Sequence, residues 1–214
     1  MSRFHRKSDG ERGVTMVELL IYIALMGITS SALYSVLISN IKSHDSIENT
    51  LVMNQDIRGG IGLMVRELRQ AALNPREVAG IGFQQNADDR YNTDANSIHF
   101  TADLNNDGNI AGAGEDVGYY VDWDINSGSN ALYRRTDYNN GGALTPQILL
   151  THVTNWQVQY LAQDEATPVA APAGSNVFFV DITLQAQTDK KDAVTGQVKT
   201  QTMQTRVRVR NAGL

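Results

Sequence analysis

Hydrophobic and polar positions divide the chain into a long apolar segment, an amphipathic segment and a region of short alternating runs. Between Gly13 and Ile41 the sequence carries a single charged residue, Glu18, behind a short head that contains basic residues up to Arg12. About 20 apolar residues are enough to cross a bilayer as a helix. The pattern therefore predicts a transmembrane helix over 14–41. Because basic flanks stay in the cytoplasm, residues 1–13 should lie inside and the rest outside.

Past Ile41 the apolar residues follow the 3.6-residue period of an amphipathic helix. One face of the helical wheel is apolar and holds Ile47, Leu51, Met53, Ile57, Ile61, Met64, Val65, Leu68 and Ala72. The other face is polar and holds Glu48, Gln55, Asp56, Arg66, Glu67 and Gln70. Asn74-Pro75 should end the helix, because proline disfavours helical geometry in the residue before it. We therefore expect one helix from about Val14 to Leu73, whose amphipathic half, 42–75, packs on a domain.

Three glycines, Gly59, Gly60 and Gly62, interrupt this amphipathic half. Each costs up to about 1 kcal/mol relative to alanine inside a helix, so something should compensate for them. Close approach of the sheet or of a neighbouring helix is the favoured explanation, and a hinge is the alternative.

From Ile81 onward the sequence changes to short runs with period-two alternation, separated by glycine, asparagine and aspartate. The predicted strands are Ser97–Thr101, Val117–Trp123, Ala131–Thr136, Ile148–Ala162, Val177–Gln187 and Thr200–Asn211. We expect Asp189–Lys199 to be a hairpin connection and Asp164–Ser175 a surface loop. A long N-terminal helix, its first half transmembrane, packed on a C-terminal antiparallel β-sheet in a globular domain over 76–214 is an α+β fold.

Composition excludes some classes of function. The 214 residues contain no cysteine, which excludes thiol catalysis and leaves packing or a metal to stabilise an exported domain. Lysine and arginine total 18 against 23 aspartate and glutamate residues, a formal net charge of −5. This acidic balance disfavours nonspecific binding to nucleic acid.

Glu18 is the most informative single residue, since a lone carboxylate at bilayer depth costs roughly 2.5–3.5 kcal/mol and usually has a partner. Gly13, Val14 and Glu18 together resemble the type III signal of type IV pilins and type II secretion pseudopilins. The resemblance implies that a prepilin peptidase cleaves after Gly13, removes the leader 1–13 and methylates the amine of Val14. It also implies that Glu18 pairs with the N-terminal amine of a neighbouring subunit. The family usually has phenylalanine where this chain has Val14.

Two other interpretations of the apolar segment were weighed against this resemblance. An ordinary single-span anchor would have the same length, but it would not need Gly13 and Glu18 at this spacing. An ordinary secretory signal would end in a small-x-small cleavage site, for which Ser30, Ser31 and Ala32 could serve. The uncharged stretch nevertheless continues to Ile41, which is longer than such a signal requires.

Later segments resemble PilW-like minor pilins. They are Met53–Arg58 with Met64–Ala71, Asp103–Gly108 and Leu132–Thr136. Pseudopilin J proteins have a segment similar to Arg66–Ala71 as well. Together these segments favour the minor pilin over the pseudopilin.

The resemblance implies a structural subunit without catalytic residues, not an enzyme. It would be a minor pilin that primes assembly of a type IV pilus, or lies at its tip, after cleavage at Gly13. The alternatives are a J-like pseudopilin of a type II secretion system and, from another class, a membrane-tethered calcium- or ligand-binding module. The implied partners are the prepilin peptidase, other minor and major pilins and the inner-membrane assembly platform. The chain would cross the inner (cytoplasmic) membrane once, with its C-terminal domain outside, and then enter the extracellular pilus.

A stretch of alternating acidic and amide residues before Gly108 reproduces the opening of a calcium loop, in which oxygen-bearing side chains converge. The candidate ligands are Asp103, Asn105, Asp107, Asn109 and Glu115 or Asp116. An EF-hand would place a bidentate glutamate at its twelfth position, where this chain has Gly114. The alternative is an Asx-rich surface turn without an ion. Calcium is thus a tentative cofactor, and no cofactor is expected to be required.

Other chemistry has little support in the sequence. The four histidines lack metal-ligand spacing, and there is no glycine-rich phosphate loop, nucleophile elbow or HExxH motif. Two arginine groups could bind phosphate or DNA, but a solvated strand face is the favoured interpretation. They are Arg134-Arg135 and the alternating Arg206, Arg208 and Arg210. Nucleic acid is therefore not an expected partner.

Overall fold

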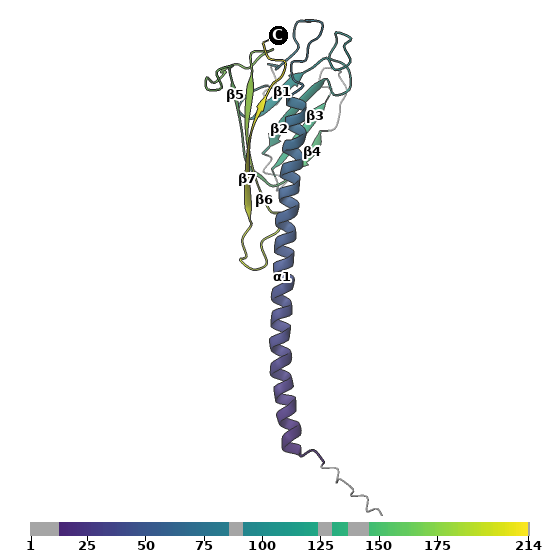
Figure 1. The fold of residues 1–214 in the computed structure, drawn as a ribbon, viewed down its shortest axis with the longest axis vertical. Helices are drawn as coiled ribbons and strands as arrows, with labels where there is room; N and C mark the ends of the chain where they lie inside the picture. Colours follow the sequence, from purple (N-terminus) through teal and green to yellow (C-terminus); the bar gives the residue numbers. More distant parts are fainter. Residues whose placement is uncertain (1–12, 86–91, 124–129, 137–145, 214) are drawn as a thin grey trace, which may run out of the picture.

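The computed structural model describes residues 13–85, 92–123, 130–136 and 146–213. A long helix, α1 (Met16–Leu68), runs along most of this part of the molecule, and the β-strands lie beside its C-terminal half (Figure 1). The described strands are β1 (Ser97–Thr101), β2 (Asp116–Asp122), β3 (Ala131–Thr136), β4 (Gln147–Leu150), β5 (Val153–Leu161), β6 (Phe179–Gln187) and β7 (Thr200–Arg208). The predicted α+β fold is confirmed.

The strands form two antiparallel sheets, where the sequence pattern predicted one. One sheet has the order β1-β2-β3-β4, and the other has the order β5-β6-β7. Within each sheet, strands that are consecutive in sequence pair with one another, which is the simplest way to build antiparallel sheets from short connections. The predicted hairpin connection at Asp189–Lys199 joins β6 to β7, which pair along their whole length.

The prediction of one strand over Ile148–Ala162 is wrong. Leu150 ends β4 and Val153 begins β5, so the run belongs to two different sheets. Between them His152 adopts a φ of 58°, a left-handed conformation that residues with a Cβ seldom take. The amide of Gln187 donates to the carbonyl of His152 at 3.0 Å and so holds this turn in place. The sequence has no glycine or proline at this break, so the pattern gave no signal that the strand ends there.

Helix α1 also ends earlier than predicted, at Leu68 and not Leu73. The next residues form tight turns, and Ala72 takes a φ of 59°. The amide of Ala72 donates to the carbonyl of Thr101 at 3.1 Å, so β1 captures the backbone before the helix can continue. Asn74 lies beyond the helix, where its side chain makes two 2.8 Å hydrogen bonds with the backbone of Val78.

The core lies between α1 and the inner faces of the two sheets. The helix contributes Met53, Ile57, Ile61, Met64 and Leu68, all buried. The sheets contribute, among others, Tyr119, Leu132, Trp156, Ile182, Leu184 and Val207. Burying side chains of this size contributes roughly 1.5–3 kcal/mol each.

Two residues that the sequence pattern places on the apolar face of the helix, Ile47 and Leu51, do not pack against the sheets. Ile47 is 56% exposed and Leu51 is 54% exposed, because the sheets cover α1 only from about Met53 onward. Their apolar side chains extend the exposed apolar surface of the first half of α1 toward the domain.

The three helix glycines are not explained by close approach of the sheet. A Cβ built on Gly59, Gly60 or Gly62 would meet no atom within 4 Å outside the neighbouring helix backbone. Nothing described in this chain therefore requires glycine at these positions. A neighbouring helix from another subunit, or a hinge, stays a prediction.

Candidate functional site

The segment around Gly13 is extended and exposed. Residues 13–15 precede α1, and Thr15 has extended backbone angles of −75° and 151°. Gly13 has no atom within 4 Å of the place where a Cβ would lie. The peptide bond between Gly13 and Val14 therefore lies outside the helix and is exposed.

The start of α1 is fixed by a helix cap. The hydroxyl of Thr15 accepts a hydrogen bond from the amide of Glu18 at 3.2 Å, and the carbonyl of Thr15 accepts one from Leu19 at 3.1 Å. Thr-x-x-Glu is the sequence of a capping box, in which the first hydroxyl satisfies an amide of the first helical turn. The helix therefore begins at Met16, directly after the predicted cleavage site.

Glu18 lies in the first turn of α1, where the positive end of the helix dipole favours a carboxylate. The phenol of Tyr22, one turn later, donates to its Oε1 at 3.3 Å. Among the described residues no lysine, arginine or histidine forms an ion pair with Glu18. Its negative charge therefore remains available to a cation from outside this part of the chain.

The first half of α1 projects away from the sheets (Figure 1). Its apolar side chains are exposed on all sides. Its most apolar 18-residue window has a mean hydropathy of 1.8 and no buried residue, so this helix is long and apolar enough to cross a membrane. The hydroxyls inside it bond to the helix itself: Thr29 donates to the carbonyl of Leu25 and Ser35 to that of Ser31, both at 3.0 Å. Such internal satisfaction is what a hydrocarbon environment demands.

The sequence pattern did not reveal a half-buried charge cluster at the far end of α1. Glu67 was assigned to the wet face, yet it makes a two-point ion pair with Arg134 at 2.7 and 3.0 Å and accepts from the hydroxyl of Tyr119. The side chains of Arg134 and Glu67 are only 15% and 12% exposed. Burial, followed by the charge of Glu67, raises the pKa of Tyr119 well above its usual value. The available signal was the position of Glu67 beside Met64 and Leu68, at the edge of the apolar stripe.

This cluster shows the environment of Arg134, which belongs to the first of the two arginine groups named above. Arg134 is not solvated as predicted, because its guanidinium binds Glu67. In the second group, Arg206 binds the carboxylate of Asp181 through two bonds of 2.6 and 2.7 Å on an exposed strand face. Both side chains have internal carboxylate partners, so neither presents an unpaired cation to a phosphate.

The predicted calcium loop is closed by its own hydrogen bonds. The carboxylate of Asp103, fully buried, accepts from the amides of Asp107 and Gly108 at 3.1 and 3.0 Å. Glu115, 2% exposed, accepts from the amides of Leu104, Asn105 and Gly112. These carboxylates satisfy backbone amides of the turn.

The other candidate ligands are divided between the loop and the sheet. Asn105 and Asn109 bond to Asp107 within the exposed turn. Asp116 lies apart from them and pairs with His99 at 2.7 Å across β1 and β2. In the part of the chain that the structure describes, no group of three or more histidine, aspartate or glutamate side chains is arranged to hold a metal. Calcium binding stays a prediction.

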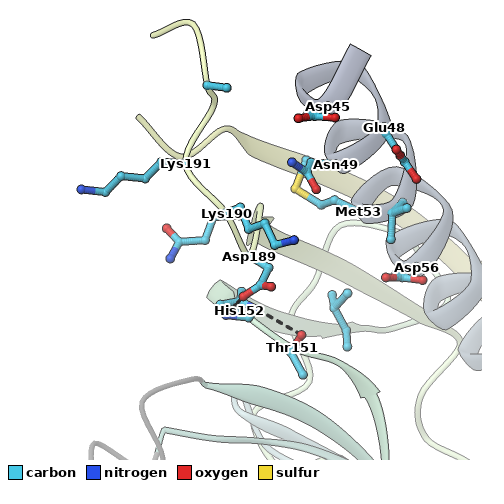
Figure 2. A pocket seen from close by; sticks show the side chains of 14 residues that line it. Asp45, Glu48, Asn49, Met53, Asp56, Thr151, His152, Asp189, Lys190 and Lys191 are labelled. Carbon is cyan, nitrogen blue, oxygen red and sulfur yellow. Dashed lines mark hydrogen bonds and ion pairs between the residues drawn. The ribbon is translucent and has the colours of Figure 1, made fainter. Parts of the chain in front are cut away.

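A polar groove of about 520 Å³ separates α1 from the turn before β5 and from the β6–β7 connection (Figure 2). The helix supplies carboxylates, among them Asp45 and Glu48, and the connection supplies Lys190 and Lys191. His152 contacts Thr151 at 3.1 Å and Asp189 at 3.2 Å. The side chains that line the groove carry charges of both signs, which suit a contact surface.

Comparison with known proteins finds a match for one segment of the chain. Residues 9–34 match the family model described as the prokaryotic N-terminal methylation motif, and the match spans Gly13, Val14 and Glu18. No curated protein and no solved structure matches the chain significantly.

Proposed function

From the N-terminal methylation motif, which supports a type IV pilin or pseudopilin, we propose that this type IV pilin-like chain is a minor pilin. After cleavage at Gly13 it would prime the assembly of a type IV pilus or lie at its tip. The motif points to a structural subunit and not to an enzyme, and it implies processing by the prepilin peptidase and contacts with other pilins. The observation that supports the proposal is the exposed Gly13–Val14 bond within the matched motif, directly before a helix whose first half is exposed and apolar.

The exposed apolar side chains in the first half of α1 must be buried by something outside the chain. Its side chains include Leu33, 72% exposed, and Ile28, 67% exposed. Each would contribute roughly 1.5–3 kcal/mol if removed from water. A bilayer provides this cover while the subunit waits for assembly, and the apolar helices of other subunits provide it in a filament.

Glu18 gives the filament a directional contact. Cleavage after Gly13 creates a new amine at Val14, and methylation leaves this amine cationic. In the proposed assembly the amine of one subunit neutralises Glu18 of its neighbour, which removes the cost of a lone carboxylate among apolar helices.

Later sequence segments favour the minor pilin over the pseudopilin, because Asp103–Gly108 and Leu132–Thr136 resemble PilW-like chains. A deletion strain separates the two. Loss of surface filaments with intact protein secretion supports the minor pilin, whereas loss of secretion with intact pili identifies a pseudopilin.

The direct test is mass spectrometry of filaments sheared from cells. We expect this chain among the sheared subunits, with a methylated N-terminus at Val14. Gly13→Val should leave the leader attached and abolish recovery in the filaments, because the peptidase acts after a residue without a side chain. Gly27→Val is the matched control for processing, since Gly27 is also exposed with no neighbour within 4 Å. Normal processing of Gly13→Val would refute the assignment.

A further inference from the structure

The connection between β6 and β7, residues 188–199, is an ordered hairpin that runs beside α1 toward its bare apolar half (Figure 1). The backbone amide of Thr188 donates to the carbonyl of Lys199 at 2.8 Å, and the backbone amide of Asp192 donates to the carbonyl of Gln197 at 2.8 Å. The carboxylate of Asp192 accepts from the amides of Val194 and Thr195, both at 2.8 Å. The tip of the hairpin, residues 193–196, is therefore a defined turn.

A buried polar cluster fixes the hairpin to the helix. Lys199 Nζ lies 2.7 Å from Asp192 Oδ2 and 2.7 Å from Ser46 Oγ, and the hydroxyl of Ser46 donates to Asp192. Asp192 is 5% exposed and Ser46 is 7% exposed. The hydrogen bond from Lys199, followed by that from Ser46, holds the pKa of Asp192 well below its usual range. The hairpin is thus held on α1 at one level, that of Ser46.

That level is close to the end of the apolar segment. Ser46 follows Ile41 by five residues, or about 7.5 Å at 1.5 Å per residue of helix. The polar layer on each side of a bilayer is roughly 5–7 Å thick, half the difference between its total and hydrocarbon thickness. The hairpin extends toward the apolar half of α1 (Figure 1). This spacing would place its tip at the height of the lipid headgroups if α1 spans a membrane.

The tip and the adjoining residues of the hairpin present aliphatic and basic side chains. Val194 is 65% exposed and Val198 is 38% exposed. Neither valine is buried by the chain itself, so the hairpin offers an apolar surface for another contact. Lys190 and Lys191 form no ion pair with a described residue, whereas Asp189 and Asp192 pair with His152 and Lys199. Aliphatic side chains with nearby lysines suit the interface, because lysine stems lie along apolar surface while their ammonium groups reach water and phosphate.

We propose that the tip of the β6–β7 hairpin contacts the lipid headgroup layer on the outer face of the membrane that α1 spans. This inference rests on the membrane anchorage of the proposed pilin, but not on its role in a pilus. With α1 as the first contact and the hairpin as the second, the domain is held in one orientation on the membrane. The contact is broken when the subunit leaves the bilayer for a filament.

The absence of cysteine allows a site-specific test on the full chain. Val194→Cys, carrying an environment-sensitive NBD fluorophore, is reconstituted in vesicles of phosphatidylethanolamine and phosphatidylglycerol. We expect a blue-shifted emission, and stronger quenching by lipids spin-labelled near the headgroup than by lipids labelled near the end of the acyl chain. Val194 is exposed, so the substitution leaves the packing unchanged.

Two control sites separate this proposal from the anchorage on which it rests. Leu25→Cys, in the bare half of α1, should be quenched most by the deep label, and Leu104→Cys, in the loop that follows β1, should not be quenched. Quenching at position 25 without quenching at 194 would overturn the hairpin contact alone. A blue shift at 194 without lipid quenching would assign the tip to a second copy of the chain and would also overturn it. No quenching at either position would refute the anchorage.

Discussion

Glu18 shows how one carboxylate can serve two purposes at the residue scale. Within the chain it sits in the first turn of α1, with Thr15 as the cap and Tyr22 as a hydrogen-bond donor. These contacts stabilise the start of the helix, but they leave the charge without a counterion among the described residues. The helix dipole favours a carboxylate at this position, and the proposed intersubunit pair would add a counterion for its charge.

Two substitutions separate these roles. Glu18→Gln keeps a side-chain oxygen in the first turn and removes the charge, whereas Glu18→Asp keeps the charge. We expect Glu18→Gln to insert in the membrane more easily, by up to roughly 3 kcal/mol, and to be lost from filaments. Glu18→Asp should retain part of its incorporation. The ratio of filament-bound to membrane-bound subunit measures the effect, and equal ratios for wild type and Glu18→Gln would show that the charge is dispensable.

The pair of Glu67 and Arg134 makes a second prediction at this scale. Glu67→Ala leaves the guanidinium of Arg134 and the hydroxyl of Tyr119 without their acceptor in a mostly buried place. Removing one partner of a buried ion pair costs about 3 kcal/mol, so the variant should be destabilised by roughly that amount. Asp56→Ala, on the exposed face of the same helix, should change stability by less than about 0.5 kcal/mol. Denaturant unfolding of both variants measures this, and similar values would contradict a structural role for the pair.

At the scale of the element, the two halves of the helix α1 have different surroundings and different distributions of apolar side chains. Its first half is apolar on all sides, and its second half is apolar only where the sheets cover it, from about Met53. The glycines in this second half are costly for a helix and have no close neighbour in the chain. A constraint outside the chain is therefore the remaining reason for them, whether a neighbouring helix or a bend during assembly.

Alanine substitution tests this explanation. Gly59→Ala and Gly62→Ala add a methyl group that meets nothing within 4 Å, so each should stabilise the isolated chain by up to about 1 kcal/mol. If the glycines serve a contact between subunits or a hinge, the same variants should assemble less well. Melting temperature and filament recovery give the two readouts. Greater stability with unchanged assembly would mean that the glycines have no role in the filament.

The loop after β1 is an element whose role the sequence left open. The calcium hypothesis predicts that the full chain, purified in detergent, melts at a higher temperature in millimolar Ca²⁺ than in chelator. A site bound only in the folded state gains about 2.7 kcal/mol at a hundredfold excess of ion over Kd. Asp103→Asn with Asp107→Asn should abolish this difference. Because Asp103 already accepts two backbone amides, an unchanged melting temperature would identify the loop as a hydrogen-bonded turn that needs no ion.

At the scale of the whole molecule, the sheets and the hairpin are arranged along the second half of α1. The two sheets hold the second half of α1, and the cluster of Ser46, Asp192 and Lys199 holds the hairpin near the start of that half. The first half of the helix is left free for a membrane or for other subunits (Figure 1). This division fits a subunit that is membrane-anchored before it assembles.

The sequence by itself determined the features that depend on local periodicity and on neighbours in the chain. The apolar segment after Gly13, the position of Glu18 and the strands β1 and β3 could all be predicted, because helix and strand periods are set by residues a few positions apart. The α+β class followed from the order of these elements. The processing motif is equally local, which is why a match over 9–34 recovers it.

Only the tertiary structure decided which distant groups meet. The left-handed backbone at His152 divides one predicted strand between two sheets, and capture of Ala72 by Thr101 shortens the helix. Arg134 donates hydrogen bonds to Glu67, 67 residues away in the sequence, and Ser46 donates one to Asp192, 146 residues away. Such pairings depend on how the sheets fold back over the helix and leave no periodic signal in the sequence. For this reason the helix and most strands were predictable, whereas the division into two sheets, the buried ion pair and the level of the hairpin were not.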